Sequence, residues 1–370
     1  MATVHKSVDL KKLTEAAGRG DAKAQFDLGI IYCGGKGVVQ DIDAAKKYLG
    51  MAADQGHVEA LYRLSTIIER HPRIFGRIPT LGDEPEPTPT YEEPTPEPDP
   101  HVLMEKAAEL GHVKAQNKMA RHYFDYVSEL YHSAKEESWA ENEPWDCVID
   151  EWAYTNALKK GWDWVTKAAK NGDRGAQYKL ASQYEIGLFT LDTSIIECDM
   201  AKAAKWYKKS AESNHIDAQY KMGLCYDEGK GVKQDKAEAV KWYMKAAERP
   251  GDSQYRGESQ YKLGLCYGNG IGVEKDISKA VEWLQKAAEK SDHPAAKYEL
   301  GHYYYNGRGV KEDQAKAMEL WLAAAHRGHL DAQKVVYHSY STGDGVKKDE
   351  EQAEYWGKRI EGIPIPELDF

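Results

Sequence analysis

Long apolar runs, signal-peptide features and paired cysteines are all missing from this sequence of 370 residues. No apolar run approaches the roughly eighteen residues that a transmembrane helix needs. The first residues, 1–10, lack an apolar core between a basic start and a small-residue cleavage site, so no secretory signal is expected. The five cysteines form no Cys-x-x-Cys pair, which favours free thiols in a reducing compartment. We therefore expect a cytoplasmic protein with no membrane segment.

Motifs of common catalytic and metal sites are missing as well. No His-Glu-x-x-His, Gly-x-Ser-x-Gly, phosphate-loop or zinc-type cysteine spacing occurs. Gly-x-Gly occurs five times at one position of a repeat, but without the third glycine and the preceding strand of a dinucleotide loop, so it marks a turn. The sequence predicts no catalytic residue, no cofactor and no metal.

Acidic residues outnumber basic ones, with 60 Asp and Glu against 50 Lys and Arg, giving a net charge of −10. This balance argues against nucleic acid as a partner, because binding to a phosphate backbone needs basic surface. It mildly favours a basic protein partner. The alternative is that the charge only keeps a long surface soluble.

The most informative feature that is present is an internal repeat. A doubled small residue recurs about every 36 residues, with two longer intervals, as in Ala52-Ala53, Ala168-Ala169 and Ala246-Ala247. After it comes a helix stop and a new helix with apolar residues four apart, such as Ala218, Met222 and Tyr226. This pattern indicates one helical face per copy.

A fixed turn follows this helix in five copies. Gly-x-Gly-Val is followed three residues after the valine by an aspartate suited to cap a second helix. These aspartates are Asp41, Asp235, Asp276, Asp313 and Asp349. One unit is thus a helix, a turn and a second helix.

Such a unit cannot bury its apolar face alone, so the units must stack. A lone helix over 8–19 is expected to cap the first of them. The eight units are predicted at 20–55, 56–110, 111–171, 172–214, 215–256, 257–292, 293–328 and 329–362.

Three motifs together carry a family resemblance. They are Ala-x-x-x-Leu-Gly-x-x-Tyr, Gly-x-Gly-Val-x-x-Asp and Lys-Ala-x-x-Trp-Tyr-x-Lys-Ala-Ala. They resemble the Sel1-like repeat family, a relative of the tetratricopeptide repeat, over almost the whole chain. The resemblance implies an all-α fold, a right-handed superhelical solenoid of about eight helix-turn-helix repeats.

Similarity to tetratricopeptide arrays further implies that the first helix of each unit lines a concave groove. Tyrosines in such a groove offer contact area at low entropy cost. The alternative for the aromatic residue two positions before the Leu-Gly leucine is packing between adjacent helices. The groove positions expected to bind a partner are Phe26, Tyr62, Arg121, Phe124, Tyr178, Tyr220, Asp227, Glu228, Tyr261, Tyr298, His302, Tyr305 and His338.

The two longer intervals hold insertions. Residues 72–100 contain nine of the fourteen prolines together with seven acids, which predicts an extended loop. This loop is either a tolerated surface insertion or an acidic arm for a basic partner. Asp99-Pro100 has the pattern of an N-cap and first position of the next helix.

The second insertion, 126–152, mixes acids with large aromatic residues, as binding hot spots do. Trp139 and Trp145 have no place in the repeat pattern, so we expect both to bind the partner. Trp162 is assigned instead to the repeat's own Trp-Tyr position and to packing.

Two classes of function remain. The leading hypothesis is a non-catalytic protein–protein interaction module, an adaptor or scaffold. The resemblance also implies a narrower version, a cytoplasmic immunity protein that neutralises a bacterial toxin. The alternative is a hydrolase of the penicillin-recognising kind attributed to some secreted members of the family, although this chain lacks their paired cysteines.

Overall fold

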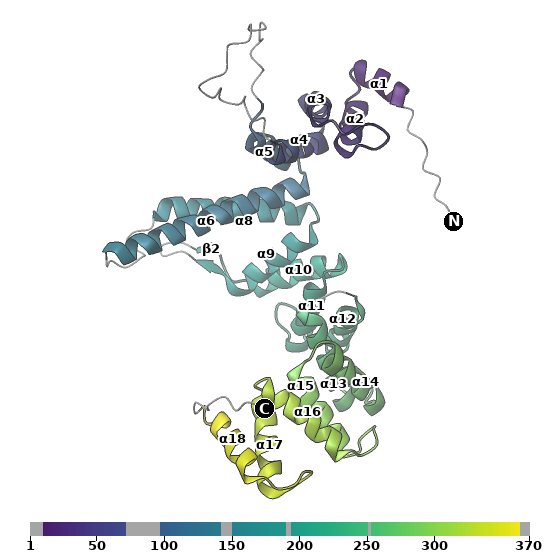
Figure 1. The fold of residues 1–370 in the computed structure, drawn as a ribbon, viewed down its shortest axis with the longest axis vertical. Coiled ribbons are helices and arrows are strands. Elements are labelled where there is room, and N and C mark those ends of the chain that lie inside the picture. The colour runs from purple at the N-terminus through teal and green to yellow at the C-terminus, as the bar shows by residue number, and fades with distance from the viewer. Residues whose placement is uncertain (1–9, 72–96, 142–149, 190–193, 251–252, 363–370) are drawn as a thin grey trace, which may run out of the picture. The chain divides into compact units, whose positions relative to one another are not determined.

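The computed structural model describes residues 10–71, 97–141, 150–189, 194–250 and 253–362, and of 136–141 and Gln254 it describes the backbone alone. The chain divides into two compact units, Met1–Ala176 and Gln177–Phe370. Within each unit, consecutive helices pair side by side along the chain (Figure 1). The predicted all-α repeat architecture is therefore confirmed.

The described residues of the first unit form helices of very different length. Six of them alternate in the repeat pattern after a short leading helix, and the last pair is the longest. The helices are α1 (Leu10–Gly18), α2 (Ala22–Gly34), α3 (Ile42–Asp54), α4 (Val58–Arg70), α5 (Pro100–Glu109), α6 (Val113–Glu141) and α8 (Glu151–Lys170).

The second unit continues the same alternation. Its elements are α9 (Arg174–Ile186), β1 (Leu188–Phe189), β2 (Ser194–Ile196), α10 (Met200–Glu212), α11 (Ile216–Glu228), α12 (Lys236–Glu248), α13 (Gln254–Asn269), α14 (Ile277–Lys290), α15 (Pro294–Tyr305), α16 (Gln314–His326), α17 (Leu330–Thr342) and α18 (Glu350–Ile360). The antiparallel hairpin β1–β2 stands where the fourth repeat lacks the glycine turn.

Both glycines of the Gly-x-Gly turn are required by the backbone. Gly229 ends α11 in the left-handed conformation at φ 73°, which glycine adopts at no steric cost. Gly231 also has a positive φ, and a Cβ there would overlap the carbonyl of Met200 at the start of the preceding repeat's second helix. Asp235 then caps α12 by accepting a hydrogen bond from the amide of Glu238, as predicted.

An alanine-glutamine pair near the start of several first helices links one repeat to the next. Gln116 donates through Nε2 to the carbonyl of Ala108, and Gln219 does the same to Ala211. Since these glutamines are buried, each bond satisfies a polar group that burial would otherwise penalise. The doubled alanine thus ends one helix and accepts the hydrogen bond that orients the next.

The Leu-Gly pair lets the two helices of a repeat approach closely. A Cβ on Gly264 would lie 2.6 Å from Cγ of Leu284, and one on Gly301 would overlap the indole of Trp321. The last repeat reverses this arrangement, because Tyr337 replaces the glycine and faces Gly357 on the second helix. The glycine thus changes helix in the last repeat, and the contact there is looser, since a Cβ on Gly357 would lie 3.4 Å from Tyr337.

A buried tryptophan stacks under a lysine on several second helices. Lys245 lies 3.8 Å from the ring centroid of Trp242, and Lys167 lies 3.8 Å from that of Trp164. Such contacts hold the lysine over the ring while its charge stays in solvent. Trp164 thus fills the repeat position, so the assignment of Trp162 to that position was wrong by two residues.

Lys46 is an exception to the apolar second-helix pattern. It is buried where the fifth repeat has Val240, and its ammonium donates to the carbonyl of His71 and to Glu97 at 2.7 Å. His71 and Glu97 flank residues 72–96, so one lysine joins the two ends of the proline-rich insertion. The rest of that insertion, and with it the proposed acidic arm, lies outside the described residues. Asp99 and Pro100 do cap and open α5, as expected.

We predict that Gly264→Ala lowers the free energy of unfolding by about 1–3 kcal/mol, because the added methyl group overpacks the α13–α14 contact. Gly357→Ala in the same unit is the control. Its Cβ would lie 3.4 Å from Tyr337, an ordinary contact, so higher helix propensity is expected to leave stability unchanged or raise it by up to about 1 kcal/mol. Urea midpoints followed by circular dichroism compare the two variants, and equal midpoints would contradict the packing account.

Candidate functional site

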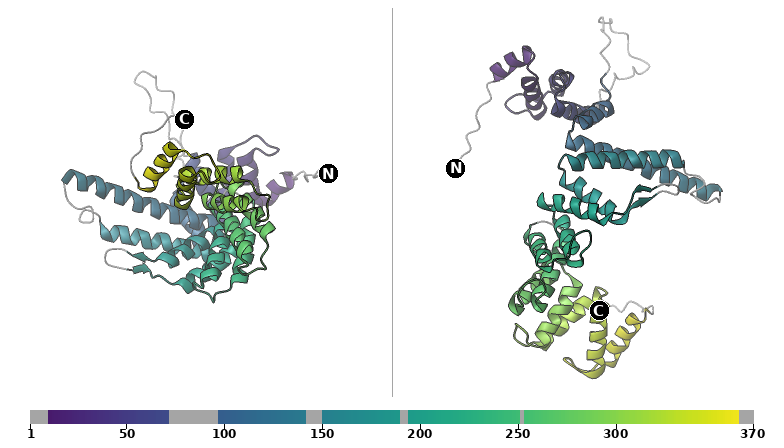
Figure 2. Two further views of the ribbon diagram at one scale, coloured as in Figure 1. Left: turned by 90° about the horizontal axis from the view of Figure 1, so that it is seen from below. Right: turned by 180° about the vertical axis from the view of Figure 1, so that it is seen from behind.

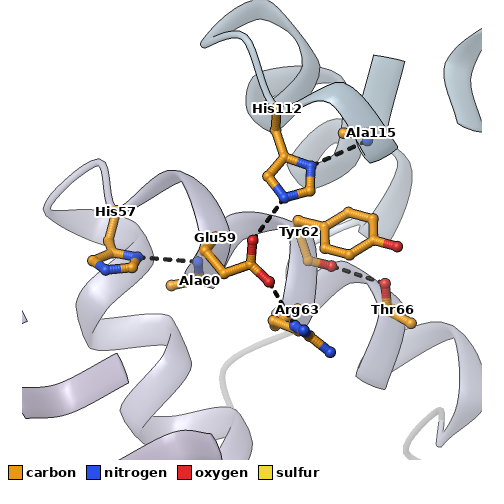
Figure 3. Close-up of polar contacts among 8 residues, drawn as sticks. All are labelled: His57, Glu59, Ala60, Tyr62, Arg63, Thr66, His112 and Ala115. Carbon is orange, nitrogen blue, oxygen red and sulfur yellow. Dashed lines mark hydrogen bonds and ion pairs between the residues drawn. The ribbon is translucent and has the colours of Figure 1, made fainter. Parts of the chain in front are cut away.

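A histidine holds each of several first helices against the repeat before it, and His112 is the example in Figure 3. Its Nδ1 accepts a hydrogen bond from the amide of Ala115 at 3.1 Å, and its Nε2 lies 2.8 Å from Glu59. Its ring stacks on Tyr62 with centroids 4.3 Å apart. Because Nδ1 accepts, Nε2 carries the proton and donates to the carboxylate.

The carboxylate of Glu59 is shared between two donors. It also accepts from Nε of Arg63 at 2.7 Å. Burial raises the pKa of Glu59, but the hydrogen bonds from His112 and Arg63 outweigh it and lower the pKa below its usual range. The carboxylate therefore stays ionised, and its hydrogen bond with His112 joins two successive repeats.

The same stacking recurs along both units. It occupies one ring face of five aromatic residues that the sequence assigned to the groove, and it supports the packing role left open for them. The stacked pairs are Phe26–His57, Tyr62–His112, Tyr178–His215, Tyr261–His293 and Tyr298–His329.

Two further groove positions also lie against neighbouring side chains. Tyr220 is buried and stacks on Tyr255. Phe124 meets the ring of Trp162 edge-on at 5.4 Å between α6 and α8. Each of these rings is held by packing.

At the far end of the second unit, His302 and Tyr305 lie beside Trp321, with centroids 5.1 and 5.5 Å from it. Burial lowers the pKa of His302. The Tyr305 hydroxyl donates to Asp344 at 2.8 Å. These two positions form one half-buried cluster.

The polar groove positions are more open. Arg121, Glu228 and His338 are exposed. Glu228 pairs with Lys230 and Asp227 pairs with Lys236, each at 2.6 Å. Trp145 and the side chain of Trp139 lie outside the described residues, so both stay predictions.

Sequence reasoning missed a carboxylate network in the fourth repeat. Glu185 accepts hydrogen bonds from the Tyr207 hydroxyl and from Lys221 at 2.9 Å. Burial raises the pKa of Glu185, but these two donors lower it overall. Glu185 lies five residues after Leu180, as Asp227 lies five residues after Met222, so counting through the repeat that lost its turn would have found it.

Sequence reasoning also missed that aromatic residues are exposed on α6 and α8. The ribbons of these two helices form a hairpin that is seen from two directions in Figure 2. Trp152 is 77% exposed, Tyr126 43% and Tyr131 37%. Helix α6 has 29 residues, against 13 in α2 and α4. The signal was the length of the helix, since Tyr126 and Tyr131 lie beyond its first thirteen residues, where the repeat pattern assigns no position.

Among residues with described side chains, no group of three or more His, Cys, Asp or Glu is placed to hold a metal ion. Cys225 and Cys266 are buried, as expected, and burial raises the pKa of each thiol to about 11. None of the described helices has the length and apolar character needed to cross a membrane.

We predict that acid weakens the second unit through His329, which caps α17 by accepting from the amide of Ala332. Burial lowers the pKa of His329 below its usual 6.5, so below pH 6.5 the unfolded chain takes up a proton that the folded chain resists. The stability from neutral His329 is thus present above that pH and is lost as the pH falls. His329→Asn keeps a capping oxygen that does not titrate. Urea midpoints at about pH 8 and 5 should fall less in this variant than in the wild type; an equal fall would contradict the prediction.

Comparison with known protein families identifies these repeats. The Sel1 repeat matches residues 22–57, 102–112, 157–173, 175–215, 216–250, 257–292, 294–329 and 338–359. A search of the curated proteins found no match.

Three similar solved structures illustrate the likeness. A protective antigen of uropathogenic Escherichia coli with an SLR fold is 24% identical over 96% of this chain, with a TM-score of 0.62, and this chain spans 64% of its length. A Sel1 repeat protein from Oxalobacter formigenes is 28% identical over 70% of this chain and 94% of its own, with a TM-score of 0.50. An immunity protein from Pseudomonas aeruginosa is 20% identical over 64% of this chain and 82% of its own, with a TM-score of only 0.35.

The matched repeats cover more than half of the chain and coincide with the helix pairs joined by histidine, glutamine and glycine contacts. This chain belongs to the Sel1 repeat family.

Proposed function

We propose that this chain is a non-catalytic protein-binding module. Its main contact surface is the outer part of the α6–α8 hairpin, which we define as the surface around Tyr126, Tyr131 and Trp152. One observation carries the proposal: Trp152, Tyr126 and Tyr131 are exposed on helices that extend beyond the length a repeat needs. At a rise of about 1.5 Å per residue, α6 is about 44 Å long.

Tryptophans of the regular repeats are buried, in contrast to Trp152. Trp242 and Trp356, at repeat positions, are 4% and 1% exposed. Tryptophan and tyrosine bury large areas when a partner covers them and dominate binding energies at interfaces. A large aromatic residue that stays exposed to solvent is therefore a candidate anchor for a partner.

The chemistry of the partner follows from charge. The insertion that contains the hairpin's outer part holds Glu136, Glu137, Glu141, Glu143, Asp146, Asp150 and Glu151, within a chain of net charge −10. We propose a partner with a basic surface, because opposite potentials speed association and exclude other partners. The exposed groove residues Arg121, Glu228 and His338 are proposed as additional polar contacts.

In its narrower form, the proposal is that the chain is a cytoplasmic immunity protein and its partner a basic toxin. The surplus of acidic residues supports a basic partner, and a growth experiment tests whether that partner is a toxin. Expressing the reading frame beside this gene should arrest growth, and co-expressing this chain should restore growth. Arrest that persists with this chain present would contradict the narrower form.

The test of the binding surface is capture of the partner from the source cell by two variants. Tyr126→Ser, Tyr131→Ser and Trp152→Ser combined should lower partner recovery about tenfold or more, since anchor residues contribute several kcal/mol. The control combines Val39→Ser, Leu110→Ser and Ile271→Ser, which remove exposed apolar side chains elsewhere. Circular dichroism checks that both variants fold.

Equal recovery by the two variants would contradict the hairpin as the site. A screen of the purified protein against β-lactam and other hydrolase substrates addresses the alternative class. Turnover that a single acid or histidine substitution abolishes would overturn the non-catalytic proposal.

A further inference from the structure

The sixth repeat departs from the histidine junction in a way that stacking does not require. Arg256 lies seven residues before the Leu-Gly leucine, the position that His293 and His329 take in the next two repeats. Helix α13 starts earlier, with Ser253 as its N-cap, and Tyr255 takes over the stack, at 5.0 Å from Tyr220. The junction is thus completed without Arg256.

The charge of Arg256 is left unmatched in the part of the chain that the structure describes. The side chain is half-buried, and its Nε is buried with no hydrogen-bond partner. By analogy with Glu59 and His112, the acid facing this position is Asp217, but Asp217 accepts from the Ser253 hydroxyl at 2.6 Å. A half-buried guanidinium without a partner costs free energy, so such a group marks a site that an anion can complete.

Arg256 lines a pocket of about 550 Å³ that is rich in positive charge. Lys290 and Arg327 line it too, and Lys290 makes no ion pair with any described residue. The N-cap residues Ser253, His293 and His329 also line it, so α13, α15 and α17 begin at the pocket with the positive ends of their dipoles. These features concentrate positive potential within a chain of net charge −10.

Negative groups near the pocket limit the charge of its ligand. Asp292 pairs with Arg327 and Lys297, which leaves Arg256 and Lys290 as the cations without a described partner. Glu258 lines the pocket and bonds His293 Nε2 at 3.2 Å, and that hydrogen bond lowers the pKa of Glu258. An ionised Glu258 repels a dianion more than a monoanion, which favours a carboxylate over a phosphate.

We propose that this pocket binds a side-chain or terminal carboxylate of an acidic protein segment, with Arg256 as its bidentate anchor and Lys290 as a second cation. Arginine's planar fork matches a carboxylate geometrically, and its charge-assisted hydrogen bonds are about twice as strong as neutral ones. The inference rests on the proposed function only in taking the ligand to be a protein segment. Its site lies in the second unit, and the hairpin lies in the first.

The test uses fluorescein-labelled hexaglutamate as the probe and the full-length protein, followed by fluorescence anisotropy at about 50 mM salt. Hexaglutamate should bind saturably and hexaglutamine should not. Arg256→His, which restores the residue of neighbouring repeats, should weaken binding about tenfold, the effect of one charge-assisted hydrogen bond. Lys290→Gln should weaken it by a smaller factor. Lys311→Gln, an exposed lysine in the turn after α15, should leave it unchanged.

Equal binding by the wild type and Arg256→His would overturn the site, as would an equal loss in Lys311→Gln, because either result means that no specific pocket contact exists. Competition with acetate and inorganic phosphate separates the ligand chemistries. Acetate, a carboxylate monoanion, should displace the probe better, and much stronger displacement by phosphate would contradict a carboxylate site. The triple serine variant of the hairpin should bind hexaglutamate like the wild type, so failure of one proposal is distinguishable from failure of the other.

Discussion

The junction between one repeat and the next is the contact on which this protein depends. A helix pair of about 36 residues cannot bury its apolar face alone, so each repeat depends on its neighbours for stability. Three specific contacts set that stacking: the histidine that caps one helix and stacks on the last, the glutamine bonded to the doubled alanine, and the second glycine of the turn. Each joins a residue of one repeat to the repeat before it.

The sequence alone predicts best those features whose residues lie close together within one repeat. The aspartate caps, the glycine turn and the buried Cys225 and Cys266 follow from local spacing. Where the last repeat loses the Leu-Gly pair, the large and the small residue change helices, as Tyr337 and Gly357. The stacking of Tyr62 on His112 could only be left as one of two alternatives, because a helical wheel does not say which face a neighbouring repeat covers.

Other features depend on contacts that periodicity does not encode. The tryptophan position was misplaced at Trp162 because α8 is longer than a repeat helix, and the correct phase runs backwards from Ala168-Ala169 to Trp164. Lys46 reads as an ordinary helical lysine until His71 and Glu97 are seen to meet at its ammonium. Arg256 reads as a surface arginine until the positions of His293 and His329 are aligned with it. In each case the feature is recognised by comparing the residue with those at the same position of the regular repeats.

The account holds that stacking consumes the regular faces of the repeats and leaves binding to the places where the repeat is broken. Hydrogen–deuterium exchange of the chain, alone and bound to its captured partner, measures this most directly. The account predicts that added protection concentrates in the outer parts of α6 and α8, with little change at the glycine turns of α11, α13 and α15. Protection spread evenly along the regular repeats, with none in the hairpin, would contradict it.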